Sequence, residues 1–209
     1  MLDGWVRRRI DPPMDRLGQG LARAGISADA VTLAGLVLGL AAAVMIVLEL
    51  DVAALVLFGL NRLLDGLDGA IARSTRRTDR GGFLDIVLDF AVYGAIPLAF
   101  ALRDPGVFAL PAAALLFAFY VNGASFLAFA AVAAKRGMST GIRGVKSIYF
   151  TAGVMEGTET ILFFVAMILF PRHFPVLAYA FAGLTVMSAL ARITLAWHAF
   201  RDEPVEESD

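Results

Sequence analysis

The chain of 209 residues contains no cysteine, and only 18% of its residues are charged, against roughly a quarter in soluble domains. The absence of cysteine excludes disulfide bonds and thiolate metal sites. The first 27 residues hold five arginines but no apolar core, so we do not expect a signal peptide. The acidic end, 201–209, is expected to be a disordered tail without a catalytic role.

Apolar residues are abundant instead, at 59% of the chain, and the mean hydropathy is +0.74. Several uncharged runs approach or exceed the roughly 18 residues that indicate a membrane-spanning helix. The pattern predicts an all-α, polytopic membrane protein, with one transmembrane catalytic domain over 28–200. Its six expected spans are 30–48, 52–73, 83–102, 107–134, 148–170 and 174–200.

Residues 1–27 are expected to form a juxtamembrane segment that lies on the membrane surface. Apolar side chains such as Trp5 and Met14 alternate with arginines at helical spacing, which is typical of an interfacial amphipathic helix. Pro12 and Pro13 are expected to break or start this helix. A disordered basic leader is the alternative.

Basic residues are unevenly divided between the two sides of the predicted bundle. One side receives the five N-terminal arginines and the basic loops 73–80 and 135–146, whereas the other receives only Arg103 and Arg172. The positive-inside rule then places both termini on the cytoplasmic side of a cell membrane.

Four aspartates occur in the stretch DGLDGAIARSTRRTDRGGFLDIVLD, residues 65–89. Asp65 and Asp68 are three residues apart, and Asp85 and Asp89 are four apart, so each pair shares one helix face. A short basic loop joins the two helices as antiparallel neighbours. We therefore expect the four carboxylates to converge just below the cytoplasmic surface.

Four carboxylates in a poorly solvated space repel one another unless cations intervene. Two Mg²⁺ or Mn²⁺ ions suit such a site, because these ions take carboxylates together with substrate phosphates. Gly69 allows close approach of a ligand, and Arg73, one turn later, can bind a phosphate oxygen. The combination favours phosphoryl transfer, with a carboxylate activating a hydroxyl group.

Three other interpretations stay open at this point. The aspartates can pair only with the nearby arginines Arg62, Arg76, Arg77 and Arg80. They can also mark a cation or proton pathway, although a carrier is expected to hold carboxylates nearer the bilayer midplane. Intramembrane prenyltransferases use paired aspartate-rich motifs too, but in two separated loops.

The stretch resembles the signature of the CDP-alcohol phosphatidyltransferases, D-x-x-D-G-x-x-A-R followed by G-x-x-x-D-x-x-x-D. The matching residues are Asp65, Asp68, Gly69, Ala72, Arg73, Gly81, Asp85 and Asp89. The family has eight residues between the two halves, whereas seven (STRRTDR) stand here. A second family segment, P-N/D-x-V/I-T, is similar to residues 28–32, where Asp29, Val31 and Thr32 match but alanine replaces proline.

The resemblance implies a six-helix enzyme of phospholipid synthesis that transfers a phosphatidyl group from CDP-diacylglycerol to an alcohol and releases CMP. The four aspartates are implied to hold two divalent ions, with Asp89 as the general base. The implied contacts with the CDP-lipid come from Asp29, Val31, Thr32, Gly69, Ala72, Arg73, Thr78 and Gly81. A homodimer is also implied, and no nucleic-acid partner is expected.

The acceptor alcohol is less clearly indicated. Phe90 follows the last aspartate, where glycerol-phosphate and inositol-phosphate members resemble one another in having lysine or arginine. The segment DFAVYGAIP instead resembles the phosphatidylserine and phosphatidylcholine synthases, which favours serine or another amino alcohol. Glu156 and Glu159 are candidates to bind an ammonium group. Lys146 and Arg192 are candidates to bind an acceptor phosphate, so a phosphorylated polyol is the alternative.

Overall fold

The computed structural model describes residues 3–137 and 157–200. Within these residues every regular element is a helix and no strand is present, which confirms the predicted all-α class. The helices are α1 (Asp3–Arg23), α2 (Ala28–Val47), α3 (Asp51–Ser74), α4 (Asp79–Arg103), α5 (Pro105–Lys135), α7 (Gly157–Leu169), the short 3₁₀ helix η1 (Pro171–His173) and α8 (Phe174–Ala199).

Four segments in the described part are long and apolar enough to cross a membrane: α2, α4, α5 and the stretch from η1 through α8. Helix α3 has 24 residues but carries the charged residues of the aspartate motif. The described part of the predicted fifth span is α7, with 13 residues, and the rest of that span lies outside the described residues. The structure therefore identifies four of the six predicted spans by length and composition.

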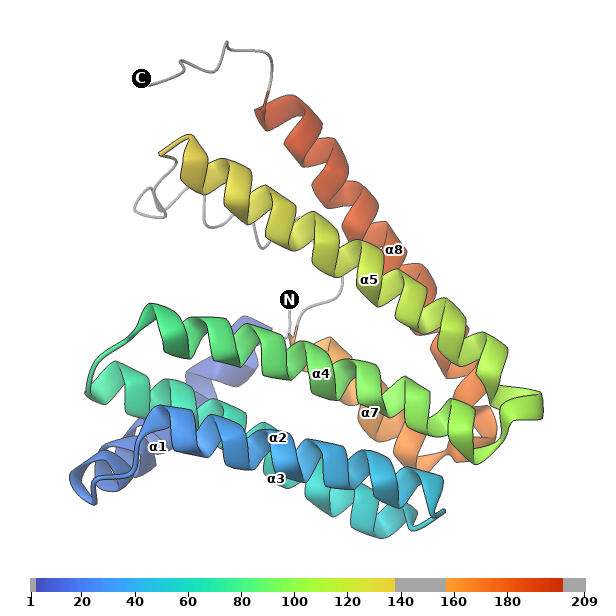
Figure 1. Cartoon of the computed structure of the whole chain (residues 1–209), viewed down its shortest axis with the longest axis horizontal. Coiled ribbons are helices and arrows are strands. Elements are labelled where there is room, and N and C mark those ends of the chain that lie inside the picture. The colour runs from blue at the N-terminus through green and yellow to red at the C-terminus, as the bar shows by residue number, and fades with distance from the viewer. Residues whose placement is uncertain (1–2, 138–156, 201–209) are drawn as a thin grey trace.

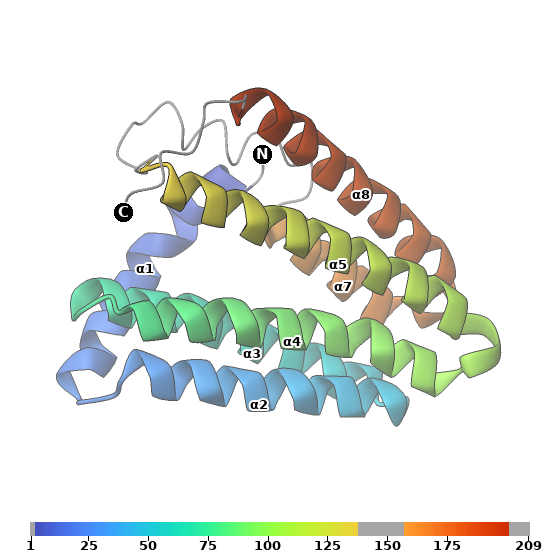
Figure 2. The same ribbon diagram turned by 45° about the horizontal axis from the view of Figure 1, so that its top comes forward.

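The helices form two groups that meet at one end of the molecule (Figure 1). Helix α2 packs against both α3 and α4, and α1 packs against α3. Helices α5 and α8 pack along each other and separate from α4 towards the C-terminal end of α5 (Figures 1 and 2). The aspartate-bearing turns of α3 and α4 lie at the end of the bundle that α1 crosses.

Local sequence signals explain where several helices begin and end. The Ser27 side chain accepts a hydrogen bond from the Ala30 amide at the start of α2, and the Asp104 side chain does the same for Val107 at the start of α5. These are N-cap interactions, which satisfy amides that have no partner within the helix. Helix α1 ends at Arg23 and is followed by Gly25, whose positive φ of 82° suits a glycine after a helix C-terminus.

The main apolar core lies away from the aspartates, where helices α2, α3, α4, α5, α7 and α8 meet. Five phenylalanines are fully buried there: Phe58, Phe100, Phe164, Phe174 and Phe181. Several of them contact each other, including Phe100 and Phe174, whose stacked rings have centroids 4.2 Å apart. This packing holds α3, α4, α7 and α8 in fixed positions and leaves the α1 end of the bundle available for polar groups.

Helix α1 runs without a break through Pro12 and Pro13, so the predicted interruption at these residues was wrong. Downstream of the prolines, Met14 packs in a small buried cluster with Val31 and Ile71. This tertiary packing on α2 and α3 fixes the second half of α1, which offsets the backbone hydrogen bonds that proline cannot donate.

Candidate active site

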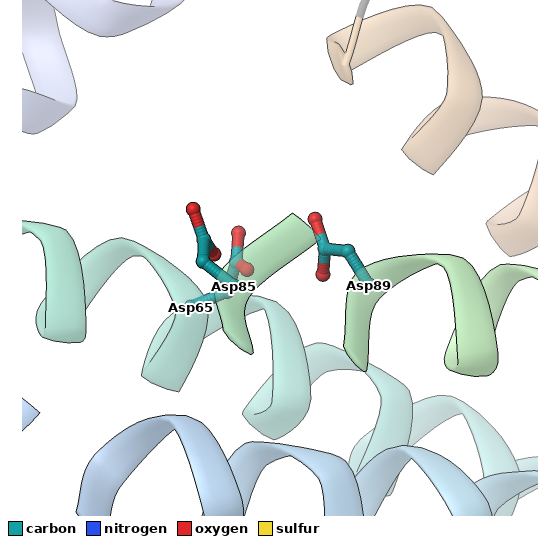
Figure 3. Close-up of side chains that lie close together, drawn as sticks. All are labelled: Asp65, Asp85 and Asp89. Atoms are coloured by element: carbon teal, nitrogen blue, oxygen red, sulfur yellow. The ribbon is translucent and has the colours of Figure 1, made fainter. Parts of the chain in front are cut away.

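Three of the four aspartates bring their carboxylates together between α3 and α4. One ligand oxygen from each of Asp65, Asp85 and Asp89 lies within 4.8 Å of the other two. Figure 3 shows the three side chains pointing to the same side, away from α2. We call these three residues the carboxylate cluster. Oxygen atoms at such separations are the donor set that a hard divalent cation requires, so the residues present fit a Mg²⁺ or Mn²⁺ ion.

The fourth aspartate, Asp68, lies beside the cluster and is hydrogen-bonded to a side chain of α2. Its side chain is 5% exposed, and its Oδ2 accepts a hydrogen bond of 2.6 Å from the Thr32 hydroxyl. Asp68 and Thr32 line the same small cavity as Asp65, Asp85 and Asp89. The predicted convergence of four carboxylates is therefore present in the geometry, with one of them held by a threonine.

A groove of about 580 Å³ opens next to this cavity. The end of α1, the start of α2, the end of α3, the loop 75–78 and the start of α4 enclose it. We call it the arginine groove because four arginines line it: Arg73, Arg76, Arg77 and Arg80. Most of the predicted substrate residues also line it: Asp29, Thr32, Gly69, Ala72, Thr78 and Gly81. Asp68 and Asp85 belong to both the groove and the small cavity, so the two spaces adjoin at the carboxylates.

Val31 is the predicted substrate residue that lies elsewhere. Its side chain is buried with Met14, Leu67 and Ile71, so it supports the packing of α1 instead of lining the groove. Thr78 has a structural task as well, because its side chain caps α4 by accepting a hydrogen bond of 3.0 Å from the Gly81 amide.

Two arginines of the groove are engaged by carboxylates outside the cluster. Arg73 donates from Nε and Nη2 to Asp15 on α1, and Arg80 donates to Asp29. The Arg80 side chain is 79% exposed, so its ion pair is open to solvent and weak. These ion pairs keep the two guanidinium groups at the groove. Each guanidinium can still exchange its carboxylate partner for another anion.

The predicted acceptor residues are only partly described. Arg192, on α8, donates hydrogen bonds from Nη1 to Asn122 Oδ1 at 2.9 Å and to Ser125 Oγ at 2.8 Å, both on α5. It lines a second hollow, between α5 and α8. Glu159 stands in the first turn of α7. Lys146 and Glu156 lie outside the described residues.

Arg62 is the main feature that sequence reasoning did not place in the site. It pairs with Asp89 at 2.9 Å and lies 3.7 Å from Asp65, and its side chain is 8% exposed. From the sequence, Arg62 was considered only as one of several arginines that can pair with the aspartates. Its spacing of three residues before Asp65, in an otherwise apolar part of α3, is the signal that distinguishes it from the loop arginines.

Comparison with known proteins agrees with this arrangement. The sequence model of the CDP-alcohol phosphatidyltransferase family matches residues 25–198, a range that includes the four aspartates of the site and the four arginines of the groove. The chain therefore belongs to the CDP-alcohol phosphatidyltransferase family.

Relatives of this chain come from bacteria and archaea. It is 46% identical over 193 residues to the inner membrane protein YnjF of Escherichia coli strain K12, covering 92% of this chain and 94% of that protein. It is 34% identical over 85 residues to archaetidylinositol phosphate synthase from Pyrococcus horikoshii, covering 40% of this chain and 45% of that enzyme.

Solved structures share the fold. Mycobacterium tuberculosis phosphatidylinositol phosphate synthase with CDP-DAG bound matches with a TM-score of 0.71 at 22% identity, covering 90% of this chain and 94% of the solved chain. The same enzyme in complex with manganese and citrate matches with a TM-score of 0.70, again at 22% identity, covering 88% of each chain.

Proposed function

We propose that this protein transfers a phosphatidyl group from CDP-diacylglycerol to the hydroxyl group of a small alcohol and releases CMP. The observation that carries the proposal is the carboxylate cluster, whose oxygens lie within 4.8 Å of one another beside a groove lined by four arginines. A groove with cationic walls suits a diphosphate, and clustered carboxylates suit divalent ions that bridge to it.

The four aspartates would hold Mg²⁺ or Mn²⁺, two ions in all, at the point where the groove meets the small cavity. Bound divalent ions neutralise the charge that develops on the transferred phosphoryl group. We assign Asp89 as the general base that takes the proton of the acceptor hydroxyl. Asp68, bonded to Thr32, presents an oriented carboxylate from a buried position.

The donor would lie in the arginine groove. Gly69 and Arg73 are the proposed partners of its diphosphate, because a glycine allows close approach of the phosphates and Arg73 offers a guanidinium one turn later on α3. Asp29 and Thr32 at the start of α2 are the proposed nucleotide contacts. Ala72, Thr78 and Gly81 complete the wall of the groove.

Two acceptor classes are supported by different observations. Phe90 directly after Asp89, together with Tyr93, favours serine or another amino alcohol, with Glu156 and Glu159 as the proposed ammonium ligands. The archaeal relative is named for an inositol phosphate product, which favours a phosphorylated polyol, with Lys146 and Arg192 as the proposed phosphate ligands. In the second case Arg192 would exchange its bonds to Asn122 and Ser125 for the acceptor phosphate.

An acceptor screen tests the proposal. Purified protein would be incubated with CDP-diacylglycerol and Mn²⁺, and CMP release measured with serine, choline, inositol, glycerol phosphate and inositol phosphate. We expect CMP with one class of acceptor and none from Asp85→Asn, which removes a charge from the cluster. Arg192→Met is expected to raise KM only for a phosphorylated acceptor. Absence of CMP with every acceptor tested, together with metal-dependent transport in liposomes, would contradict the enzyme assignment.

We further propose that both termini and the arginine groove face the cytoplasm and that two copies of the chain form a homodimer. The concentration of arginines at the groove supports the orientation, and the family resemblance supports the dimer. Mass measurement of the detergent-solubilised protein tests the dimer, and a single copy at assay concentrations would contradict it.

A further inference from the structure

Arg62 lies on α3, one turn before Asp65, and each of its three guanidinium nitrogens donates a hydrogen bond to another side chain. Nη2 donates to Asp89 Oδ1 at 2.9 Å, Nη1 donates to the Tyr93 hydroxyl at 3.0 Å, and Nε donates to Asn61 Oδ1 at 2.8 Å. The group also lies over the Tyr93 ring, 5.0 Å from its centroid. These contacts fix the plane and the position of the charge.

The anchoring reaches a third helix. Asn61 is 3% exposed, and its Nδ2 donates to the Gly35 carbonyl on α2 at 2.9 Å. A continuous hydrogen-bond chain therefore runs from the backbone of α2, through Asn61 and Arg62 on α3, to Asp89 on α4. Because such a chain orients each member, the position of the Asp89 carboxylate depends on α2, α3 and α4 together.

The burial of Arg62 separates its role from that of the groove arginines. A guanidinium taken out of water costs several kcal/mol unless it is paired, and this one is 8% exposed. Each of its nitrogens already donates to a protein group, and Arg62 does not line the arginine groove, so it is poorly placed to bind a substrate phosphate. Arg73 and Arg80, in contrast, are 38% and 79% exposed. Arg62 therefore acts on the carboxylates and not on the substrate.

We propose that Arg62 is a positioning residue for Asp89 and a fixed cation of the metal site. By holding Oδ1 of Asp89, it leaves the other oxygen to face a metal ion or the acceptor hydroxyl. Its permanent charge, 3.7 Å from Asp65 as well, lowers the negative charge that a divalent ion meets at the cluster. The catalytic part of this inference rests on the proposed function, whereas the effect on metal binding does not.

Two substitutions at Arg62 separate the effect of its positive charge from the effect of its hydrogen bonds. Arg62→Gln removes the cation, so Mn²⁺ should bind about tenfold more tightly, because a positive charge beside the cluster repels the ion and solvent screens most of that repulsion. Arg62→Lys keeps the charge but cannot bond to Asp89, Tyr93 and Asn61 together. Its Mn²⁺ affinity should therefore stay within about twofold of the wild type.

The matched control is Arg103→Gln. Arg103 lies on α4 and is similarly buried, with a side chain that is 12% exposed. It pairs with Asp51 of α3 at the end of the bundle opposite the aspartate site. Its loss should lower the thermal unfolding temperature to a comparable extent and leave the Mn²⁺ affinity unchanged. Binding of Mn²⁺ alone to the purified proteins, followed by electron paramagnetic resonance of the free ion, gives these affinities without any turnover.

Turnover provides the second readout. With CDP-diacylglycerol and the acceptor identified by the screen, both Arg62 variants should lose kcat about tenfold to a hundredfold with an unchanged KM for the donor, because the base is misoriented while the groove is intact. Unchanged or weaker Mn²⁺ binding by Arg62→Gln would overturn the fixed-cation role, and an unchanged kcat would overturn the positioning role. Absence of CMP from the wild type would count against the proposed function and leave the Mn²⁺ result to decide the inference.

Discussion

Arg73 on α3 donates two hydrogen bonds to a single oxygen of Asp15 on α1, from Nε at 3.1 Å and from Nη2 at 2.7 Å. The two side chains are 38% and 43% exposed, so the pair is stable enough to orient Arg73 and weak enough to exchange. Arg73, the proposed partner of the donor's diphosphate, is thus held by α1 when no donor is bound. Donor binding then competes with Asp15 for the same guanidinium.

This competition predicts opposite effects for the two partners. Asp15→Asn should lower the KM for CDP-diacylglycerol about twofold to fivefold, because Arg73 loses its competing carboxylate. Arg73→Ala should raise that KM about tenfold, because a charge-assisted bond to phosphate is lost. Steady-state CMP release at varied donor concentration measures both. A higher KM for Asp15→Asn would show instead that Asp15 positions Arg73 for the phosphate.

The close contact between α1 and α3 gives a prediction about stability. A Cβ atom added at Gly18 would lie 2.7 Å from the Ala70 Cβ and 2.9 Å from the Ala70 backbone, whereas one added at Gly20 would meet nothing within 4 Å. Gly20→Ala should therefore stabilise the protein by up to about 1 kcal/mol through helix propensity. Gly18→Ala should destabilise it by about 1–3 kcal/mol, since the backbone of α3 must shift.

Thermal unfolding in detergent compares the two alanine variants, and the same samples can be assayed for turnover. Gly18→Ala is also expected to reduce CMP release, because α1 carries Asp15 and borders the arginine groove. Equal unfolding temperatures for the two variants would contradict the tight α1–α3 contact.

The fold was largely predictable because its signals are local. Long apolar runs define the helices, and caps such as Ser27 and Asp104 define their starts. The continuity of α1 through Pro12 and Pro13 was not predictable, because it depends on packing against residues about fifty positions later in the chain. The six-span count was an inference from hydropathy, of which the described residues account for four spans.

In the candidate site, too, local patterns were predictable from the sequence and contacts between distant residues were not. The spacing of the four aspartates predicts that they converge, because positions three and four apart share a helix face and the short loop makes the helices neighbours. The hydrogen bond from Thr32 to Asp68 was not part of that pattern. Asp15 lies 58 residues from Arg73, and no local pattern connects them. Tyr93 stood in a motif that was interpreted for acceptor choice, yet its hydroxyl contacts Arg62.

Asp89→Asn tests the assignment of the base. The substitution keeps the shape and one oxygen for Arg62 but removes the proton acceptor, so kcat should fall by about a hundredfold or more. Binding of CDP-diacylglycerol should stay within a few fold, because Asp89 does not line the arginine groove. Donor binding measured alongside CMP release distinguishes these effects. Retention of a wild-type rate would refute the role of Asp89 as base.

The absence of cysteine makes the membrane orientation directly testable. Cysteine introduced at Arg76, in the arginine groove, or at Arg172, in the turn before α8, is the only thiol of each variant, and both positions are exposed. A membrane-impermeant maleimide added to intact spheroplasts should label Arg172→Cys and leave Arg76→Cys unlabelled, since four arginines near the groove favour the cytoplasmic side.

Permeabilised membranes provide the control, because both variants should then be labelled to the same extent, and the parent chain supplies a blank without thiols. Labelling of Arg76→Cys from outside intact spheroplasts would reverse the proposed orientation. It would also place the carboxylate cluster, the proposed site of CMP release, on the side of the membrane away from the cytoplasm.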